Sequence, residues 1–354
     1  MSEQIDRGRV VEALLAPRPS KSVVALPDFY LDHIVRYPYG VERFVEDVKR
    51  IAQQGGGNII DIPQQYTLGG NASNFADTLA RLGSKVYLIA RTSPFGKMCL
   101  QHFLEGLKVD LTHVKVDSHL STSSIVEMNL SGRLVNVMIG DAGGLKDFDA
   151  NKLDEEDLKL LEDADYVCVF NWCQNKFGTE LFLQVAKVVG RNDFGYLFID
   201  IGDPSSRIDE LKTLCEGLCK VGKIGGLGLN ENEAYWVGKT LGCESEDRSE
   251  LAAYISKRFE GEILLHTAEL SSHNIKGEAT SIPTFDVKPQ KATGAGDCWN
   301  AGYILGLILD LSYTERIFLA NAVAAAHITK PVSERITLDD VVRIVREGKL
   351  RVKS

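Results

Sequence analysis

The chain has 354 residues, of which 44% are hydrophobic and 25% are charged, and its formal net charge is −9. These values are typical of a soluble globular protein with a substantial core, and the negative charge disfavours a nucleic-acid or anionic-membrane surface. The odd number of cysteines does not suggest a disulfide framework, the charged N-terminus does not resemble a secretory signal, and no apolar run is long enough to span a membrane. We therefore expect a cytoplasmic protein.

Short apolar runs alternate with amphipathic stretches along the chain. The runs with the length and composition of buried strands are residues 21–29, 85–90, 165–172, 195–200 and 262–267. Helical spacing of apolar residues predicts helices at 71–83, 178–190, 248–259 and 337–348, and two packed helices within 297–329. This alternation predicts an α/β fold in which helices cover both faces of a mostly parallel sheet. The basic tail after residue 348 is expected to be solvated.

Two segments interrupt this alternation. Residues 123–141 alternate in character and contain the hairpin signal Ser131-Gly132, and residues 58–70 form another extended piece. A helix is expected at residues 41–54, just before residues 58–70 in the chain. We predict a small β lid, formed by residues 31–68 and 121–141 with this inserted helix. The core domain then comprises residues 1–30, 69–120 and 142–354.

The stretch Thr293-Gly-Ala-Gly-Asp297 stands where a loop turns into an apolar helix. Gly294 and Gly296 allow a tight turn that exposes backbone N–H groups, and these groups form an anion site together with the helix dipole. A carboxylate repels a bound phosphate, so its presence there indicates a role other than phosphate binding. Accepting the proton of an attacking hydroxyl in phosphoryl transfer is such a role. On this pentapeptide alone, an ordinary helix cap is the alternative for Asp297.

Two further loops carry residues suited to a polyol and a nucleotide. Gly69 and Gly70 lie at a loop–helix junction where glycine permits close backbone approach, and Asn74 offers a donor and an acceptor to hydroxyl groups. Asn230 and Glu233 are three residues apart at a helix start, hence on one face. Oxygen ligands in this arrangement suit hydrated Mg²⁺ and the phosphate oxygens around it.

With these motifs in this order, the chain resembles the PfkB family of carbohydrate kinases, which have the ribokinase-like fold. The matching elements are "PDFYLDHIV", "GGNASN", "NENEA", "LLHTAE", "TGAGD" and "FLANAVAAAHIT", and they span roughly residues 22–330. The resemblance implies a three-layer α/β sandwich with a mostly parallel central sheet and a small β-strand lid. It also implies transfer of a terminal phosphoryl group from ATP or ADP, with Mg²⁺, to a sugar, sugar phosphate or nucleoside. A homodimer formed through the lid is expected as well.

The resemblance also assigns roles to residues of this chain. Asp297 is implied as the catalytic base, and the backbone of residues 293–297, including Gly294, Ala295 and Gly296, as the anion hole. The residues expected at the acceptor are Asp28, Asp32, Gly69, Gly70, Asn74, Arg133 and Asn171. Those expected at the nucleotide are Asn230, Glu233, Thr267, Thr293 and Asn321, with Asn230 and Glu233 organising Mg²⁺ through water and phosphates.

The chain departs from the family pattern just before this loop. The family commonly has an acidic and then a hydroxyl residue where this chain has Lys291 and Ala292, and that pair helps many relatives to bind an activating potassium ion. We hypothesise that the Lys291 ammonium replaces the ion. A lysine exposed at the loop edge is the alternative.

Other departures leave the donor and the acceptor open. Glu269 replaces a family glycine, and the surrounding motif also resembles archaeal ADP-dependent sugar kinases, so ADP is an alternative donor. Arg91, Arg133 and Lys176 introduce cations near the expected acceptor site. If they face it, a sugar phosphate such as ribose 1-phosphate is an alternative acceptor, because arginine binds phosphate strongly.

Two other classes of function fit these motifs less well. A catalytically silent sugar or nucleotide sensor is an alternative, although retention of Asp297 argues against it. A dehydrogenase and a P-loop enzyme are both disfavoured, because neither a GxGxxG turn after the first strand nor a GxxxxGK[ST] loop occurs.

Overall fold

The computed structural model describes residues 5–221, 224–291 and 293–352, so the departure at Ala292 lies outside the described residues. Within these ranges, nine strands form one sheet in the order β15-β14-β13-β12-β11-β10-β1-β4-β6. In chain order they are β1 (Val23–Leu26), β4 (Val86–Leu88), β6 (Val109–Asp110), β10 (Tyr166–Val169), β11 (Tyr196–Asp200), β12 (Gly226–Leu229), β13 (Glu262–His266), β14 (Leu270–Ile275) and β15 (Glu278–Pro283). Strand β14 pairs antiparallel with both β13 and β15, and the other neighbouring strands pair in parallel, which confirms the predicted mostly parallel sheet.

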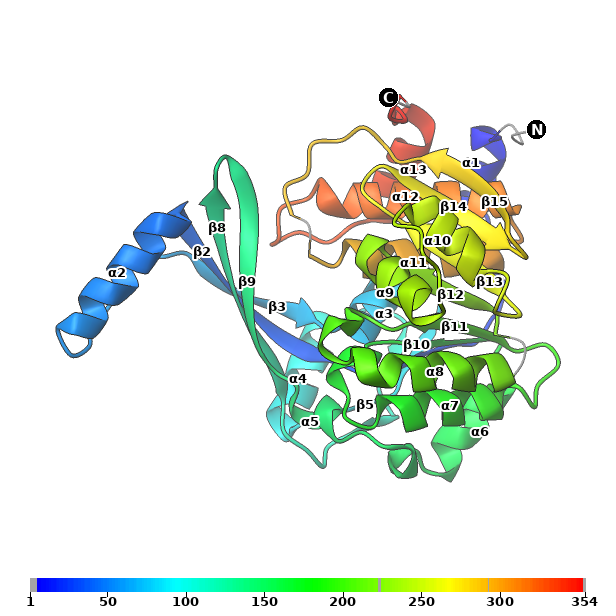
Figure 1. Cartoon of the computed structure of the whole chain (residues 1–354), viewed down its shortest axis with the longest axis horizontal. Helices are drawn as coiled ribbons and strands as arrows, with labels where there is room; N and C mark the ends of the chain where they lie inside the picture. Colours follow the sequence, from blue (N-terminus) through cyan, green and yellow to red (C-terminus); the bar gives the residue numbers. More distant parts are fainter. Residues whose placement is uncertain (1–4, 222–223, 292, 353–354) are drawn as a thin grey trace.

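Helices cover both faces of this sheet (Figure 1). Successive side chains of a strand point to opposite faces, so Val23 and Ala25 of β1 join one core while Val24 and Leu26 join the other. The first core includes α1 (Arg7–Leu15), α3 (Asn71–Arg81), α4 (Pro94–Phe103), α11 (Ala295–Ile308), α12 (Tyr313–Ile328) and α13 (Leu338–Glu347). The second includes α6 (Glu155–Asp163), α7 (Gly178–Val189), α8 (Ile208–Val221), α9 (Glu231–Thr240) and α10 (Arg248–Ile255). No helix among the described residues is long and apolar enough to cross a membrane.

The predicted strands and helices of the core are confirmed, most of them in shortened form. The run at 85–90 is divided by Ile89 into β4 and β5 (Ala90–Arg91), and β5 pairs with β7 (Val114–Lys115). Sequence patterns missed β12, whose "GLGL" contains few strand-forming residues, and the polar hairpin β14–β15 at the sheet edge. Short helical segments lie at α5 (Gly143–Lys146) and at Ala150–Lys152, Trp172–Gln174 and Pro204–Ser206.

A second sheet has the strand order β3-β2-β8-β9. Its strands are β2 (Tyr30–Gly40), β3 (Gln64–Gly69), β8 (Ser121–Leu130) and β9 (Arg133–Asp141). The β8–β9 turn lies at Ser131 and Gly132, which have positive φ angles of 50° and 82° and form the expected hairpin. The predicted inserted helix is α2 (Val41–Gln53), and it projects away from the body of the molecule (Figure 1). We propose that this sheet and α2 form the lid.

Helices α11 and α12 pack closely against each other, which sets the position of the α11 N-terminus. A Cβ atom at Gly302 would lie 2.7 Å from the Cα of Ala320, so glycine is needed where the two helices meet. Both helices are largely buried. The position of the "TGAGD" loop is therefore set by two closely packed, buried helices.

Candidate active site

The N-terminus of α11 has the features of an anion site. Gly294 is the N-cap with a φ of 79°, no described side chain caps the helix, and Asp297 lies in its first turn. The first N–H groups of a helix have no acceptor within it, and the helix dipole adds positive potential there. On the preceding turn, the carbonyl oxygen of Thr293 lies 2.9 Å from Nε2 of His327. Burial lowers the pKa of His327 to about 3, so the ring is neutral and Nε2 donates this hydrogen bond.

The carboxylate of Asp297 is held by two amides from the N-terminus of α3. Nδ2 of Asn71 donates to Oδ1 at 2.9 Å, and Nδ2 of Asn74 donates to Oδ2 at 3.0 Å. Burial raises the pKa of Asp297 well above the usual range for a carboxyl, and repulsion from Asp200 and Asp28 acts in the same direction, against the two amide hydrogen bonds. A carboxylate that is oriented and has a raised pKa is suited to accept a proton.

Asp297 faces a cavity of about 730 Å³ between the core and the second sheet. The residues that line it are Tyr30, Asp32, Gly70, Asn71, Asn74, Ser123, Ile125, Met138, Gly140, Asp141, Ala142, Lys146, Asn171, Gln174, Thr293, Gly294 and Asp297. Most of them carry amide, hydroxyl or carboxylate groups, which form hydrogen bonds with a polyol. We call this space the acceptor cavity.

Asp32 is positioned in the acceptor cavity by β2 and by the neighbouring strand. A Cβ atom at Gly69 would lie 2.2 Å from the Asp32 carboxylate, so Gly69 makes room for it and does not line the cavity itself. Burial raises the pKa of Asp32 to about 7, Arg335 opposes this shift and Asp28 adds to it. Asp32 thus offers its carboxylate to a ligand in the acceptor cavity.

Asp28, expected at the acceptor, does not line the acceptor cavity. Its two carboxylate oxygens accept from the backbone N–H groups of Asn71 and Ala72 at 3.0 and 2.8 Å, and from Nδ2 of Asn171 at 2.9 Å. Asp28 therefore anchors the N-terminus of α3, which carries the amides that hold Asp297. Asn171, in a left-handed conformation with φ 57°, does line the cavity.

The three cations that suggested a phosphorylated acceptor are not at this cavity. Arg91 is buried against Asp117, at 3.0 Å, and Arg133 is exposed at the tip of the β8–β9 hairpin. Lys176 lies over the ring of Phe177. Among the described residues that line the cavity, the cation is Lys146, at the end of α5.

A second cavity, of about 400 Å³, lies on the other side of the loop. Its lining residues are Asn230, Glu231, His266, Thr267, Ala268, Thr284, Phe285, Val287, Pro289, Lys291, Ala295, Gly296, Trp299, Asn321, Ala324, Ala325, Ile328 and Arg351. Thr293 and Gly294 thus face the acceptor cavity, whereas Ala295 and Gly296 face this one. Thr293, expected at the nucleotide, lines the acceptor cavity. We call the second space the donor cavity.

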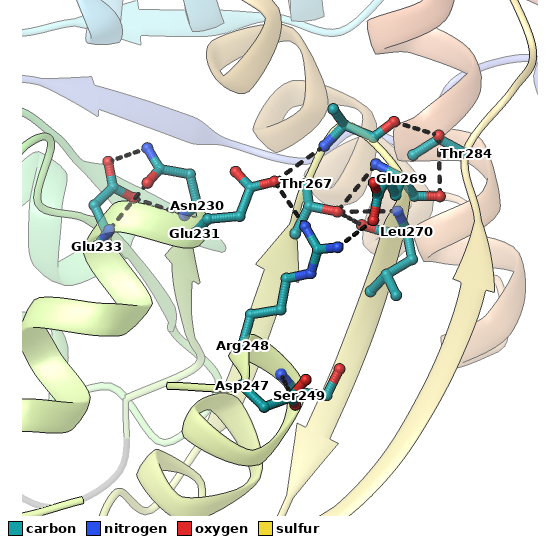
Figure 2. Close-up of polar contacts among 11 residues, drawn as sticks. Asn230, Glu231, Glu233, Asp247, Arg248, Ser249, Thr267, Glu269, Leu270 and Thr284 are labelled. Carbon is teal, nitrogen blue, oxygen red and sulfur yellow. Dashed lines mark hydrogen bonds and ion pairs between the residues drawn. The ribbon is translucent and has the colours of Figure 1, made fainter. Parts of the chain in front are cut away.

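The predicted pair Asn230 and Glu233 forms a capping box at the start of α9. Oδ1 of Asn230 accepts from the backbone N–H of Glu233 at 3.0 Å, and the Glu233 carboxylate accepts from the backbone and side chain of Asn230 at 2.9 and 2.7 Å (Figure 2). Asn230 lines the donor cavity and Glu233 is buried behind it. Burial raises the pKa of Glu233 well above its usual range, and repulsion from Asp200 adds to this.

Thr267 and Asn321 also line the donor cavity, but their polar groups already have partners. The Thr267 hydroxyl donates to the carbonyl of Leu270 at 2.8 Å and closes the turn between β13 and β14 (Figure 2). Oδ1 of Asn321 accepts from Trp299 Nε1 at 2.8 Å and from Ser271 at 2.6 Å. Both residues shape the cavity wall in this geometry.

An ion-pair cluster lies at the edge of the donor cavity (Figure 2). Arg248 of α10 contacts Glu231, at 3.3 Å, and Glu269. Glu231 also accepts from the backbone N–H of Ala268 at 3.3 Å. Glu269, which replaces a family glycine, thus helps to tie the turn between β13 and β14 to helices α9 and α10.

Sequence patterns missed several residues of the acceptor cavity. Asn71 lies inside the "GGNASN" motif, next to the predicted residues Gly70 and Asn74, and this position was the signal that could have identified it. Tyr30 donates to Oε1 of Gln174, and both line the cavity. For these two and for Lys146 no local pattern signals the role, because the chain brings them together only in the fold.

Comparison with known proteins agrees with this architecture. Residues 44–337 match the model of the pfkB family of carbohydrate kinases. The chain belongs to this family. It is a carbohydrate kinase, a phosphotransferase, with the ribokinase-like fold that the sequence predicts.

Individual relatives support the same conclusion at low identity. The kinase is 24% identical to a ribokinase of Haemophilus influenzae over 316 residues, which cover 88% of this chain and 93% of that protein. The structure of Arabidopsis thaliana ribokinase, complexed with ribose and ATP, superposes with a TM-score of 0.70 at 18% identity, covering 93% of this chain and 99% of that one. Adenosine kinase from Sinorhizobium meliloti superposes with a TM-score of 0.72 at 14% identity, covering 92% and 99%.

Proposed function

We propose that this kinase transfers the terminal phosphoryl group of a nucleotide to a hydroxyl group of a sugar or nucleoside, with Asp297 as the base. The observation that carries the proposal is the placement of one loop between two cavities. Asp297 faces the polar acceptor cavity, and Ala295 and Gly296 line the donor cavity behind it. A hydroxyl in one cavity and a polyphosphate in the other would meet at the N-terminus of α11.

The reaction then follows from the groups at this point. Asp297, oriented by Asn71 and Asn74, accepts the proton of the acceptor hydroxyl as its oxygen bonds to the terminal phosphorus. The bond from that phosphorus to the bridging oxygen of the nucleotide breaks, and the shortened nucleotide leaves. Backbone N–H groups of the first turn of α11 stabilise the charge that spreads over the transferred oxygens.

We infer that Mg²⁺ is held through water, in the region of Asn230 and Glu233. No group of three or more His, Cys, Asp or Glu residues in the described part of the chain is arranged to hold a metal ion directly. Both oxygens of Glu233 are engaged by Asn230, whereas repulsion among Glu233, Asp200 and Asp297 favours a nearby cation. Hard oxygen groups with retained waters suit Mg²⁺, which would neutralise the donor phosphates.

The charges of the acceptor cavity favour an acceptor without a phosphate group. Arg91 and Lys176 lie elsewhere, and Asp32, Asp141 and Asp297 outnumber Lys146 among the described lining residues. A phosphorylated acceptor would need more positive charge than this. A sugar or nucleoside is therefore our first choice, and ribose 1-phosphate is the alternative to be tested.

We also propose a homodimer through the lid. Strand β9 exposes Leu134, Val137 and Ile139, whose exposed fractions are 59%, 52% and 68%. Apolar side chains gathered on one exposed strand are typical of interaction surfaces. Sedimentation at several concentrations tests this proposal.

A phosphoryl-transfer screen tests the function directly. ATP and ADP serve as donors, each with sugars, nucleosides and sugar phosphates as acceptors, and Asp297→Asn is assayed beside the wild type. We expect acceptor-dependent nucleotide turnover with an unphosphorylated acceptor, and loss of that turnover in the variant. Binding of ligands without turnover would instead support the sensor alternative.

The activity should fall on acidification at a higher pH than is usual for a carboxylate base. A base works only when ionised, so the raised pKa of Asp297 moves this loss of activity upwards in pH. Asp32, with its pKa raised to about 7, adds a loss of acceptor binding as the pH falls through that value. The pH profile of kcat/KM for the acceptor measures both. A profile flat down to pH 5 would contradict these assignments.

We expect activity to be insensitive to the choice of potassium or sodium. Nζ of Lys291 donates to the carbonyl oxygens of Glu334 and Pro331 at 3.2 and 3.4 Å, so an ammonium occupies a position lined by carbonyl groups. Burial, with repulsion from Arg335, lowers the pKa of Lys291 to about 8, so activity should also fall as the pH rises through that value. Rates in KCl and NaCl should agree within about twofold.

A matched pair of variants completes this test. Lys291→Ala should reduce the rate, and Lys330→Ala, whose ammonium pairs with Asp340 at 2.9 Å outside both cavities, should not. Several-fold stimulation of the wild type by potassium would refute the replacement of an ion by Lys291.

A further inference from the structure

The C-terminal tail, expected to be solvated, instead forms part of the fold. Its backbone pairs with the segment that follows β15: Asp286 N–H donates to the carbonyl of Lys349 at 2.7 Å, and Arg351 N–H donates to that of Thr284 at 2.8 Å. Phe285 and Leu350 form the antiparallel bridge between these two bonds. The tail is therefore held beside residues 284–286.

The position of the tail is also fixed from the other side. Nη1 of Arg7 in α1 donates to the carbonyl oxygens of Gly348 at 2.9 Å and Val345 at 3.2 Å. A Cβ atom at Gly348 would lie 2.6 Å from the ring of Phe285, so the backbone packs tightly there. The contacts on both sides set where the Arg351 side chain begins.

The segment that holds the tail is a wall of the donor cavity. Thr284, Phe285 and Arg351 all line it, and the Thr284 hydroxyl donates to the carbonyl oxygens of Ala268 and Glu269 at 2.9 and 3.2 Å (Figure 2). Arg351 is thus tied through Thr284 to the turn that borders the cavity.

The two ends of the donor cavity differ in chemistry. Ala295 and Gly296 lie at the end next to Asp297, whereas the rest of the lining combines polar side chains with a set of apolar ones. The apolar residues are Phe285, Val287, Pro289, Ala324, Ala325 and Ile328. Phosphates suit the first end and a nucleobase suits the second.

Arg351 belongs to the apolar end. Its Nε donates to the carbonyl of Phe285 at 3.5 Å, and its Nη1 and Nη2 have no partner among the residues that the structure describes. Lys291, the other cation of the described lining, directs its ammonium to the carbonyl oxygens of Pro331 and Glu334. The guanidinium of Arg351 is exposed and available to a ligand.

We propose that Arg351 is a donor-binding residue that covers the nucleobase of the bound nucleotide. A planar guanidinium stacks on a heterocycle and donates to its nitrogen and oxygen acceptors. The proposal rests on the function assigned above, because it takes the donor cavity as the nucleotide site. The C-terminal tail then contributes to donor affinity and leaves the transfer step to the α11 loop.

Steady-state kinetics of Arg351→Ala test this role. We expect KM for the nucleotide to rise about tenfold, as for loss of a charged hydrogen-bonding group, while kcat and the acceptor KM change by less than about twofold. Arg346→Ala is the matched control, since Arg346 is exposed in the last turn of α13 and lies outside both cavities. Arg351→Ala keeps the backbone hydrogen bond from residue 351 to Thr284, so the variant removes only the side chain.

Two results would overturn the proposal. One is an unchanged nucleotide KM in Arg351→Ala, and the other is an equal fall in kcat, which would place the residue at the phosphate end. Calorimetric titration with ATP measures the contribution of Arg351 to nucleotide binding without turnover. A wild type that binds ATP but transfers nothing would refute the proposed function, and weaker ATP binding by Arg351→Ala would still support this inference.

Discussion

Asp297→Asn should reduce kcat between about 10²- and 10⁴-fold, the usual contribution of a positioned general base. Asparagine has nearly the same shape and can still accept from Asn71 or Asn74, but it cannot take the proton of the attacking hydroxyl. The KM values for donor and acceptor should change much less than kcat. Steady-state rates at saturating substrates measure the effect.

Stability separates this loss from a folding defect. Because the pKa of Asp297 is raised in the folded state, the ionised carboxylate destabilises the fold at neutral pH, and stability increases as the pH falls. The neutral asparagine variant should therefore unfold at the same temperature or a higher one at pH 7. Wild-type turnover in this variant would remove Asp297 from the mechanism, and a markedly lower melting temperature would contradict the stability argument.

Asp32→Asn should raise the acceptor KM by about 10- to 100-fold, with little change in the donor KM. A hydrogen bond to a charged group contributes about 1.5–3 kcal/mol, and each 1.4 kcal/mol corresponds to about a tenfold change. Asp32 lines the acceptor cavity and is only 8% exposed. Kinetics with each substrate varied in turn measure the two KM values separately.

Asp77→Asn is the matched control for Asp32. Both carboxylates are influenced by Arg335, but Asp77 pairs with Arg81 at 2.8 Å and does not line either cavity. This variant should keep the acceptor KM. If Asp32→Asn and Asp77→Asn raised the acceptor KM equally, the effect would act through Arg335 and not through contact with the acceptor.

Local chemistry accounts for what the sequence predicts well. Short apolar runs predicted the parallel sheet, and period-3.6 patterns predicted its covering helices, because burial on both faces or on one face shows in neighbouring residues. The inserted helix at residues 41–54 was also predicted. The capping box of Asn230 and Glu233 and the turn at Gly294 are equally local, since a cap or a positive φ depends on a few consecutive residues. These features made the anion site and the reaction class predictable.

Local patterns failed where the fold assigns a different task to the same type of residue. Asp28 and Asp32 stand four residues apart on one extended stretch, yet Asp28 anchors α3 and Asp32 opens into the acceptor cavity. The sequence suggested that Arg91 and Arg133 could bind an anionic acceptor. In the structure, Arg91 pairs with Asp117 and Arg133 lies at the tip of a hairpin. Which carboxylate or cation has its partners inside the protein depends on segments far away in the chain.

The sequence by itself determined that this protein is an α/β kinase with an anion-binding loop and a carboxylate beside it. The tertiary structure alone decided which groups surround that carboxylate: Asn71 lies 226 positions from Asp297 in the chain and donates to it at 2.9 Å. The same holds for Arg351, which reaches the donor cavity because the tail pairs with Thr284. Hydrogen bonds and charges act over a few ångströms of space, and only the folded chain sets those distances.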